Sequence, residues 1–316
     1  MLDAANFKLL NDWQRGFPLA PRPFAEIAAG CGLGEDEVIG RFRLLRSRGL
    51  IDRIGPVFRP NTVGASTLAA LAAPAERLQG VAGQVSRHAS VNHNYERENR
   101  FNLWFVVTAA DAAAVESEIL CIERETGLPV LRLPLLESFH IDLGFDLESQ
   151  IAPRSGPGPV APPTLSDEER TLVAALGAGL PLVSRPYAAL GAPEQAILDT
   201  LRRWLESGVV RRIGAVVRHR RLGYEANAMV VWDVPDDRVG DAGRRLAADA
   251  AVTLCYRRAR ALPDWRYNLY CMLHGRERSR VTWEVKRISA LHGLSSFPRA
   301  MLFSTRCFSQ RAARYG

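Results

Sequence analysis

The feature that most constrains this chain of 316 residues is an internal duplication. The segment 49-GLIDRIGPVFRPNTVG-64 recurs as 208-GVVRRIGAVVRHRRLG-223, with glycine, isoleucine and arginine in step. Self-similarity of this kind is the sequence signature of repeated structural units. Two related halves are therefore predicted, and the chain is long enough for each to bury a core.

A second pair of matching stretches follows in each half. VNHNYER at 91–97 corresponds to VTLCYRR at 252–258, and FNLWFVV at 101–107 corresponds to YNLYCML at 267–273. Their β-branched and aromatic residues predict strands. Half two carries additional residues, 259-ARALPDW-265, between the two strands.

The halves are separated by 151-IAPRSGPGPVAPPT-164, whose Pro, Gly and small residues cannot bury an apolar face and therefore predict a linker. The predicted domains are a winged helix-turn-helix over 1–60, a ferredoxin-like domain over 61–150, the linker over 151–165, a second winged helix-turn-helix over 166–218 and a second ferredoxin-like domain over 219–316.

Helical periodicity and glycine stop signals support the winged helix-turn-helix units. The predicted helices and following strand are 23–30, 35–48 and 51–58 in half one, and 185–190, 193–207 and 209–217 in half two.

The remainder of each half follows the order βαββαβ, which is the ferredoxin-like order. In half one we predict strands at 65–72, 91–97, 101–108 and 130–143 and helices at 75–88 and 110–127, and half two repeats the order over 226–308. The predicted fold class is α+β, a tandem duplication of winged helix-turn-helix plus ferredoxin-like units.

The net charge of +7 is carried almost wholly by arginine, because Lys8 and Lys286 are the chain's lysines. Guanidinium groups bind carboxylates and phosphates through two parallel hydrogen bonds and stack on flat π systems, so this surface suits planar or polyanionic partners. Codon bias in a GC-rich genome is the alternative explanation for the excess of arginine over lysine.

Other global features are those of an ordinary globular chain. No apolar stretch reaches the about 18 residues of a membrane span, and the N-terminus has no secretion signal, so a cytoplasmic location is expected. The five cysteines form no CxxC pair, which argues against a disulfide framework or a zinc site. We expect them to be reduced and mostly buried.

Helix-turn-helix units usually indicate nucleic-acid binding, but the local charges oppose it here. The N-terminal turn of a recognition helix meets bases and phosphates, yet it reads 35-EDE-37 in half one and 193-PE-194 in half two. We therefore do not expect DNA binding and predict that the module serves packing and assembly.

The chemistry-bearing residues of half one lie on one predicted strand. Strand alternation places His93, Tyr95 and Arg97 on one face, with Asn94 and Glu96 on the other. Together with the apolar strand at 101–107, they predict a pocket with an apolar floor and a cationic rim.

Half two has leucine at Leu254, where half one has His93, so the duplicates have diverged. The corresponding region of half two contains more arginines instead. Arginines beside aromatic residues suit a large flat ligand that bears several carboxylates. A solvated hairpin with extended arginines is the alternative. The candidate ligand-binding residues of this half are Tyr256, Arg257, Arg258, Arg260 and Trp265, and Arg100 belongs to the set in half one.

The other histidines carry less specific signals. His88, His219 and His292 are expected at the surface, whereas His140 and His274 lie on or beside predicted strands.

These motifs resemble a known family. The winged helix-turn-helix followed by βαββαβ resembles the Lrp/AsnC-like regulators, and NHNYER with FNLWFVV, together with CYRR and LPDWRYNLYCMLHG, resembles the siroheme decarboxylases more closely. Half one resembles the D-type subunit and half two the L-type subunit, fused in tandem. The resemblance implies removal of the C12 and C18 acetate carboxyls of siroheme to give 12,18-didecarboxysiroheme in haem d1 biosynthesis.

The resemblance also implies roles for particular residues. It places His93, Tyr95 and Arg97 and the matching Tyr256, Arg257 and Arg258 at the ligand, with His140 added from the SFHIDLGF segment. His93 is the first candidate for proton donor and His140 the second, and either is an alternative ligand of the siroheme iron. No cofactor is expected, because the iron tetrapyrrole is the substrate.

The family architecture implies an internal pseudo-dimer with the ligand between the paired sheets, and we expect one productive site. A further homodimer is compatible with the sequence. The rival functions are a ligand-responsive transcription regulator and a non-catalytic tetrapyrrole carrier.

Overall fold

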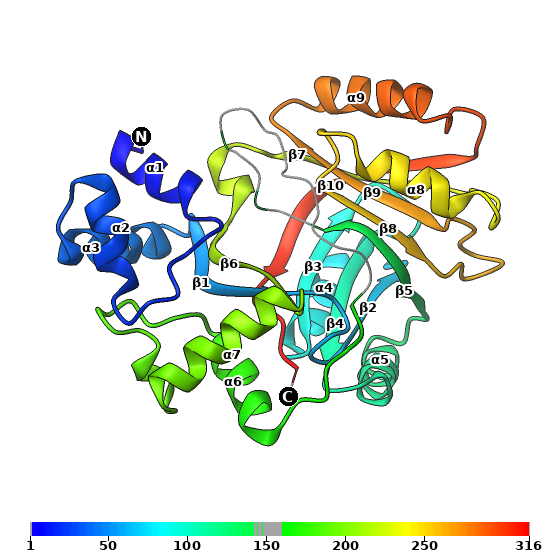
Figure 1. Cartoon of the computed structure of the whole chain (residues 1–316). Coiled ribbons are helices and arrows are strands. Elements are labelled where there is room, and N and C mark those ends of the chain that lie inside the picture. Colours follow the sequence, from blue (N-terminus) through cyan, green and yellow to red (C-terminus); the bar gives the residue numbers. More distant parts are fainter. Residues whose placement is uncertain (1, 142–143, 145–146, 148–159, 316) are drawn as a thin grey trace. The chain divides into compact units, whose positions relative to one another are not determined.

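The computed structural model describes residues 2–141, 144, 147 and 160–315, which form two compact units (Figure 1). The first unit is built mainly from Met1–Val63 and Val160–Leu222, and the second mainly from Gly64–Phe145 and Gly223–Gly316. Each unit thus contains corresponding parts of both halves. The predicted domain limits stay predictions, and most of the predicted linker at 151–165 lies outside the described residues.

The first unit contains the helix-turn-helix elements. Its helices and strands are α1 (Ala4–Asp12), α2 (Pro23–Cys31), α3 (Glu35–Ser47), β1 (Ile51–Phe58), α6 (Asp167–Gly177), η1 (Ala188–Leu190), α7 (Glu194–Glu206), β6 (Val210–Val217) and η2 (His219–Leu222). The two predicted wings, β1 and β6, pair antiparallel with Gly55 opposite Gly214. A side chain at Gly214 would overlap the backbone of Gln14, which explains the glycine at this point of the repeat.

The helices of this unit differ from the prediction at three places. The helix predicted at 185–190 is wrong, because the structure has only the 3-10 turn η1 there. Pro186 lacks a backbone donor, and Gly191 in the left-handed region (φ 83°) ends the turn. Helices α1 and α6 lie outside the predicted elements, although Asp3 and Ser166 cap them with side-chain hydrogen bonds.

The second unit contains the predicted βαββαβ order twice. Its elements are β2 (Ala65–Leu71), α4 (Leu78–Arg87), β3 (Val91–Arg97), β4 (Leu103–Ala109), α5 (Ala112–Thr126) and β5 (Val130–Ile141), followed by β7 (Ala226–Trp232), α8 (Val239–Ala247), β8 (Leu254–Arg258), β9 (Leu269–Gly275), α9 (Arg278–Leu291) and β10 (Arg299–Gln310). The α+β fold class is confirmed. The predicted end of one strand at 142–143 lies outside the described residues.

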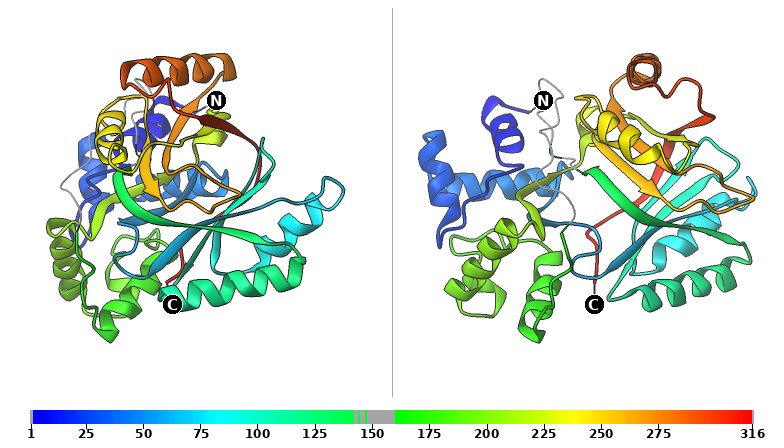
Figure 2. Two further views of the ribbon diagram at one scale, coloured as in Figure 1. Left: turned by 90° about the vertical axis from the view of Figure 1, so that its right-hand side faces the viewer. Right: turned by 45° about the vertical axis from the view of Figure 1, so that its right-hand side comes forward.

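The strands of the second unit close into a barrel in the order β10-β3-β4-β2-β5-β8-β9-β7. Two long strands join the halves: β5 pairs with β2 and then with β8, while β10 pairs with β7 and then with β3. Figure 2 shows β5 (green) and β10 (red) running between the two sets of strands. The predicted internal pseudo-dimer is therefore formed by two edge-to-edge seams, β5/β8 and β3/β10.

Three apolar clusters stabilise this unit, since burial of apolar surface is the main favourable term in folding. One lies between the half-one strands and helices and includes Val85, Phe105 and Ile119. Its half-two counterpart includes Trp232 and Ile288.

The third cluster draws on strands of both halves, and it includes Ala70, Trp104, Leu133, Met229, Tyr270 and Leu302. This cluster fills the side of the strands that faces away from the helices. Among the described residues, no helix is long and apolar enough to cross a membrane.

Candidate functional site

Strand β3 carries His93, Tyr95 and Arg97 on the side that faces away from the helices. Asn94, which lies between His93 and Tyr95, faces the helices: it donates to the carbonyl of Ala82 (3.1 Å) and the hydroxyl of Ser86 (3.0 Å), both on α4. Because side chains alternate along a strand, His93, Tyr95 and Arg97 project to the opposite face. The predicted shared face is therefore present.

Arg97 is a buried guanidinium at the end of β3, with 8% of the residue exposed. Its Nη1 donates to the Leu302 carbonyl of β10 at 3.2 Å, and its Cζ lies 5.7 Å from the centre of the Tyr95 ring. A second contact runs to the sulfur of Met272 at 4.0 Å. Arg97 therefore joins strand β3 of half one to strands of half two.

Arg258 occupies the matching position at the end of β8. Its Nη1 donates to the Leu133 carbonyl of β5 at 2.9 Å, and its Cζ lies 5.1 Å from the Tyr256 ring centre and 6.0 Å from that of Tyr270. The repeat thus gives two matching positions related by pseudo-two-fold symmetry, Arg97 and Arg258, which we call the arginine stations. Each arginine is hydrogen-bonded to a carbonyl of the other half. The carbonyls of Leu133 and Leu302 were missed from the sequence, since they face the arginines only once the seams form.

The charge of Arg258 is not balanced by the described part of the protein. Burial lowers the pKa of the guanidinium, and the other groups that act on this pKa are the two neighbouring tyrosines, with no carboxylate. Part of the residue reaches the surface, but Nε is buried and has no hydrogen-bond acceptor among the residues that the structure describes. A desolvated charge without a counter-ion is costly, so this position is suited to bind an anion.

His93 lies half-buried on the seam β3/β10, opposite Gln310 in the register. Its Nδ1 is 2.9 Å from Oδ1 of Asn92, and its ring stacks on Tyr95 with centres 6.2 Å apart. When Nδ1 donates to the amide oxygen, the second ring nitrogen, Nε2, is the one that exchanges a proton. The orientation of this histidine is thus set by its neighbours on the strand.

His140 lies on the other seam. It is buried (3% exposed) near the end of β5, opposite Cys255 of β8. In the strand order of the barrel, the seams β3/β10 and β5/β8 lie opposite each other. The structure therefore places the two candidate histidines on different seams, one near each arginine-bearing strand.

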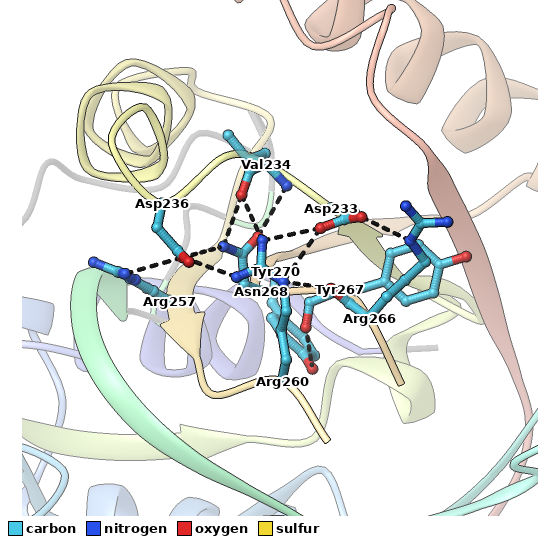
Figure 3. A network of polar contacts seen from close by, with 9 residues as sticks. All are labelled: Asp233, Val234, Asp236, Arg257, Arg260, Arg266, Tyr267, Asn268 and Tyr270. Carbon is cyan, nitrogen blue, oxygen red and sulfur yellow. Dashed lines mark hydrogen bonds and ion pairs between the residues drawn. The ribbon is translucent and has the colours of Figure 1, made fainter. Parts of the chain in front are cut away.

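Two other candidate arginines of half two are held in ion pairs, as Figure 3 shows. Arg260 donates to Asp233 (2.9 Å), Asp236 (2.8 Å) and the Val234 carbonyl (2.7 Å), and Arg257 lies 3.2 Å from Asp236. Their charges are thus balanced within the protein, in contrast to that of Arg258.

The acids of this network are ionised. Burial tends to raise the pKa of Asp233, but hydrogen bonds from Arg260 and Arg266 outweigh it, and the pKa lies below its ordinary value. The pKa of Asp236 is lowered chiefly by the hydrogen bond from Arg260. The network therefore anchors the loop that carries these arginines.

Trp265 is the buried end of the additional segment in half two. Its indole Nε1 donates to the Tyr270 hydroxyl at 2.7 Å, and its ring lies 5.0 Å from Trp104 and 6.0 Å from Phe101 of half one. At the tip of the half-one hairpin, the exposed Arg100 lies 3.2 Å from Asp264 of the same segment. The segment thus fills space between the halves at the end of the strands where the arginine stations lie.

A matched pair of asparagines was absent from the predicted set. Asn102 exchanges two hydrogen bonds with the backbone of Ala73, and Asn268 does the same with Val234. The sequence signal that could have identified them is the asparagine that both halves share, in FNL at 101–103 and in YNL at 267–269. These residues hold the chain directly beside the arginine stations.

Two expectations about the remaining residues were wrong. His219 is buried rather than at the surface, because it lies in η2 where the chain packs after β6. The cysteines are not mostly buried: Cys255 and Cys271 are buried, Cys31 and Cys121 are half-buried and Cys307 is exposed.

Comparison with known families identifies both kinds of domain in each half. The AsnC-like ligand binding domain matches residues 63–140 and 221–309, and the siroheme decarboxylase NirDL-like HTH domain matches residues 7–51 and 169–211. The matches occur twice, in agreement with the predicted duplication.

Whole-length relatives carry the same arrangement. The siroheme decarboxylase NirDL subunit of Paracoccus denitrificans (strain Pd 1222) is 45% identical over 99% of this chain and 97% of its own length. The siroheme decarboxylase of Hydrogenobacter thermophilus is 34% identical over 98% and 94%.

A crystal structure of the siroheme decarboxylase NirDL in complex with an iron-uroporphyrin III analogue aligns with a TM-score of 0.68 and 28% identity. The alignment covers 98% of this chain and 93% of that chain.

Proposed function

The chain belongs to the siroheme decarboxylase family, and on that premise we propose that it converts siroheme to 12,18-didecarboxysiroheme by removing the C12 and C18 acetate carboxyls. The step would serve haem d1 biosynthesis. Relatives that span nearly the whole chain support the reaction. The iron-uroporphyrin III analogue bound to a solved relative supports an iron tetrapyrrole as the ligand.

The observation that carries the proposal is the partly buried guanidinium of Arg258, which has no carboxylate partner among the described residues. Siroheme bears eight carboxylates, and an arginine with unused donors in a low-dielectric setting binds one of them more strongly than a solvated arginine does. Arg97, at the pseudo-symmetric station, would hold a second carboxylate. The spacing of the two would fix which acetate meets the reacting groups.

The aromatic residues would bind the flat face of the macrocycle. Tyr95 lies under Arg97 and Tyr256 under Arg258, so each station combines a cation with a π surface. Arg100, Arg257 and Arg260 stay in the proposed set as an outer rim. Their carboxylate partners would have to be exchanged for those of the substrate.

The chemistry is a non-oxidative decarboxylation. The bond between the acetate methylene and its carboxyl carbon breaks, CO2 leaves, and the electron pair stays on the methylene carbon, where the macrocycle delocalises it. One proton then converts that carbon to methyl. An apolar environment with few donors at the reacting carboxylate favours loss of its charge, and no oxidant or cofactor is needed.

We assign the proton donor to His93 first and His140 second. The contact of His93 Nδ1 with Asn92 would orient Nε2 toward the substrate, and the pKa of a free imidazole, about 6.5, suits proton transfer near neutral pH. The histidine that does not donate the proton is the candidate ligand of the substrate iron. One productive site is proposed, because Leu254 replaces His93 in the second half.

The test is anaerobic incubation of the purified chain with siroheme, followed by mass analysis of the extracted tetrapyrrole. Two successive losses of CO2 are expected. Siroheme recovered unchanged, with an altered visible spectrum while bound, would instead identify a carrier.

A role in transcription is disfavoured by the helix-turn-helix unit. The first turn of α3 carries Glu35, Asp36 and Glu37, and Arg22 and Arg41 are engaged with two of these acids. Little positive charge is left there for a phosphate backbone. Salt-dependent binding of the purified chain to operator DNA would support the regulator instead.

A further inference from the structure

A second cluster of ligating side chains lies on the helical side of half one, away from the strand face that carries Arg97. His88 ends α4, and Glu118, Cys121 and Glu125 lie along α5 at spacings of three and four residues, which places them on one face of that helix. Ligand atoms of His88, Cys121 and Glu125 all lie within 4.8 Å of one another.

Two distances within the cluster are close to those of a tetrahedral metal site. His88 Nε2 lies 3.2 Å from Glu125 Oε2, and Cys121 Sγ lies 3.5 Å from Glu125 Oε1. Tetrahedral zinc with ordinary bond lengths separates nitrogen from oxygen by about 3.3 Å and sulfur from oxygen by about 3.5 Å. The two contacts end on different oxygens of the Glu125 carboxylate, so the three ligands would share one ion only after the carboxylate turns.

Neighbouring groups orient these side chains. Glu118 accepts from His88 Nδ1 at 2.5 Å, which directs Nε2 toward the other two ligands. Zinc-bound histidines commonly donate their other ring N–H to a carboxylate in this way. Arg124 lies 3.4 Å from the Cys121 sulfur, so a positive charge stands beside this ligand. His88 is held in place through its backbone, because Arg311 donates to its carbonyl.

We propose that His88, Cys121 and Glu125 bind a zinc ion, with Glu118 orienting His88 and water completing the coordination. The ion fastens the end of α4 to α5 and stabilises the helical layer of half one, independently of the tetrapyrrole. His88 lies far from Cys121 and Glu125 in the sequence and the set includes one cysteine, which is why cysteine spacing predicted no zinc site. Without an ion, the contacts of His88 with Glu118 and Glu125 hold the same groups together.

Cobalt(II) substitution of the full chain, treated with chelator and free of tetrapyrrole, tests the site. We expect one cobalt ion per chain, a sulfur-to-cobalt charge-transfer band in the near ultraviolet, and displacement of cobalt by zinc. Cys121→Ser should remove the band, whereas Cys31→Ser, the matched half-buried cysteine of the helix-turn-helix unit, should keep it.

Two further variants keep the test decisive if Cys121→Ser folds poorly. His88→Gln and Glu125→Gln should each weaken cobalt binding at least tenfold and remove the rise in thermal midpoint that zinc gives the unaltered chain. A chain that takes up no cobalt, or a band that survives Cys121→Ser, would overturn the proposal. Because siroheme is absent, failure here says nothing about decarboxylation.

Discussion

At the scale of single residues, the difference between paired and unpaired arginines organises the site. Arg260 and Arg257 have carboxylate partners within the protein, whereas Arg258 donates to a backbone carbonyl and lies against tyrosines. Composition alone cannot tell which of these arginines bind a ligand and which form ion pairs within the protein. Only their partners separate the residues that anchor a loop from the residue suited to bind a substrate carboxylate.

His93→Ala is predicted to bind siroheme but to turn it over about 10² to 10⁴ times more slowly, the usual contribution of a general acid. Single-turnover rates and the visible absorbance of bound ligand separate the two effects. The matched control is His88→Gln, a histidine of the same half that lies on the helical side. Normal turnover by His93→Ala, or equal losses in both variants, would reassign the proton donor.

The pH dependence of stability follows from Asp233. Its pKa is lowered in the folded chain, so its pairs with Arg260 and Arg266 stabilise the fold above the unfolded value of about 3.9 and lose this effect as pH falls through the folded value. Asp233→Asn should therefore lower the free energy of unfolding at pH 7 and flatten its fall below about pH 4. Denaturant titrations between pH 7 and 3 measure the free energy of unfolding of both chains. If this free energy fell equally with pH in Asp233→Asn and in the unaltered chain, the role of Asp233 would be contradicted.

At the scale of elements, the additional segment at 259–265 breaks the symmetry of the repeat. It places Trp265 among Phe101 and Trp104 of half one, and no matching segment precedes β4. Half two also lacks a histidine at Leu254. The two arginine stations therefore have different surroundings, which supports one productive orientation of the substrate.

Trp265→Ala is predicted to destabilise the chain by about 3 to 5 kcal/mol, because it removes a large buried side chain and the donor to Tyr270. Leu262→Ala in the same segment should change stability by less than about 0.5 kcal/mol, since Leu262 is 70% exposed. Thermal unfolding of the two variants compares them directly. Similar midpoints would show that the segment does not contribute to the core.

Local elements could largely be predicted from the sequence, and contacts between distant elements could not. The alternation of His93, Tyr95 and Arg97 follows from the strand period, and the duplication revealed βαββαβ twice. The bonds of Arg97 to Leu302 and of Arg258 to Leu133 depend on strands more than 100 residues apart. The partners of Arg260 and the burial of His219 likewise depend on how loops pack.

At the scale of the whole molecule, the duplication makes the halves depend on each other. The seams β5/β8 and β3/β10 supply edge partners that each half lacks alone, and unpaired strand edges are a liability in isolated sheets. Relatives named as separate NirD and NirL subunits match about half of this chain each. The fused chain corresponds to such a pair of subunits.

Fragments 1–150 and 160–316, produced together, are predicted to purify as one complex, since backbone pairing at both seams does not require the connecting segment. The same fragments produced separately should aggregate or show a lower thermal midpoint. Size-exclusion chromatography with light scattering gives the mass. Elution of two separate folded species would show that the seams do not hold the halves together.

The affinity of siroheme for Arg258→Met, followed by visible absorption under anaerobic conditions, tests the central claim most directly. Methionine keeps the volume of the buried side chain without its charge, so the fold should persist. Loss of a charged, partly desolvated contact should weaken binding by about 1.5 to 3 kcal/mol, roughly 10 to 150-fold. The exposed control Arg266→Met should bind nearly normally, and equal affinities of the two variants would contradict the account.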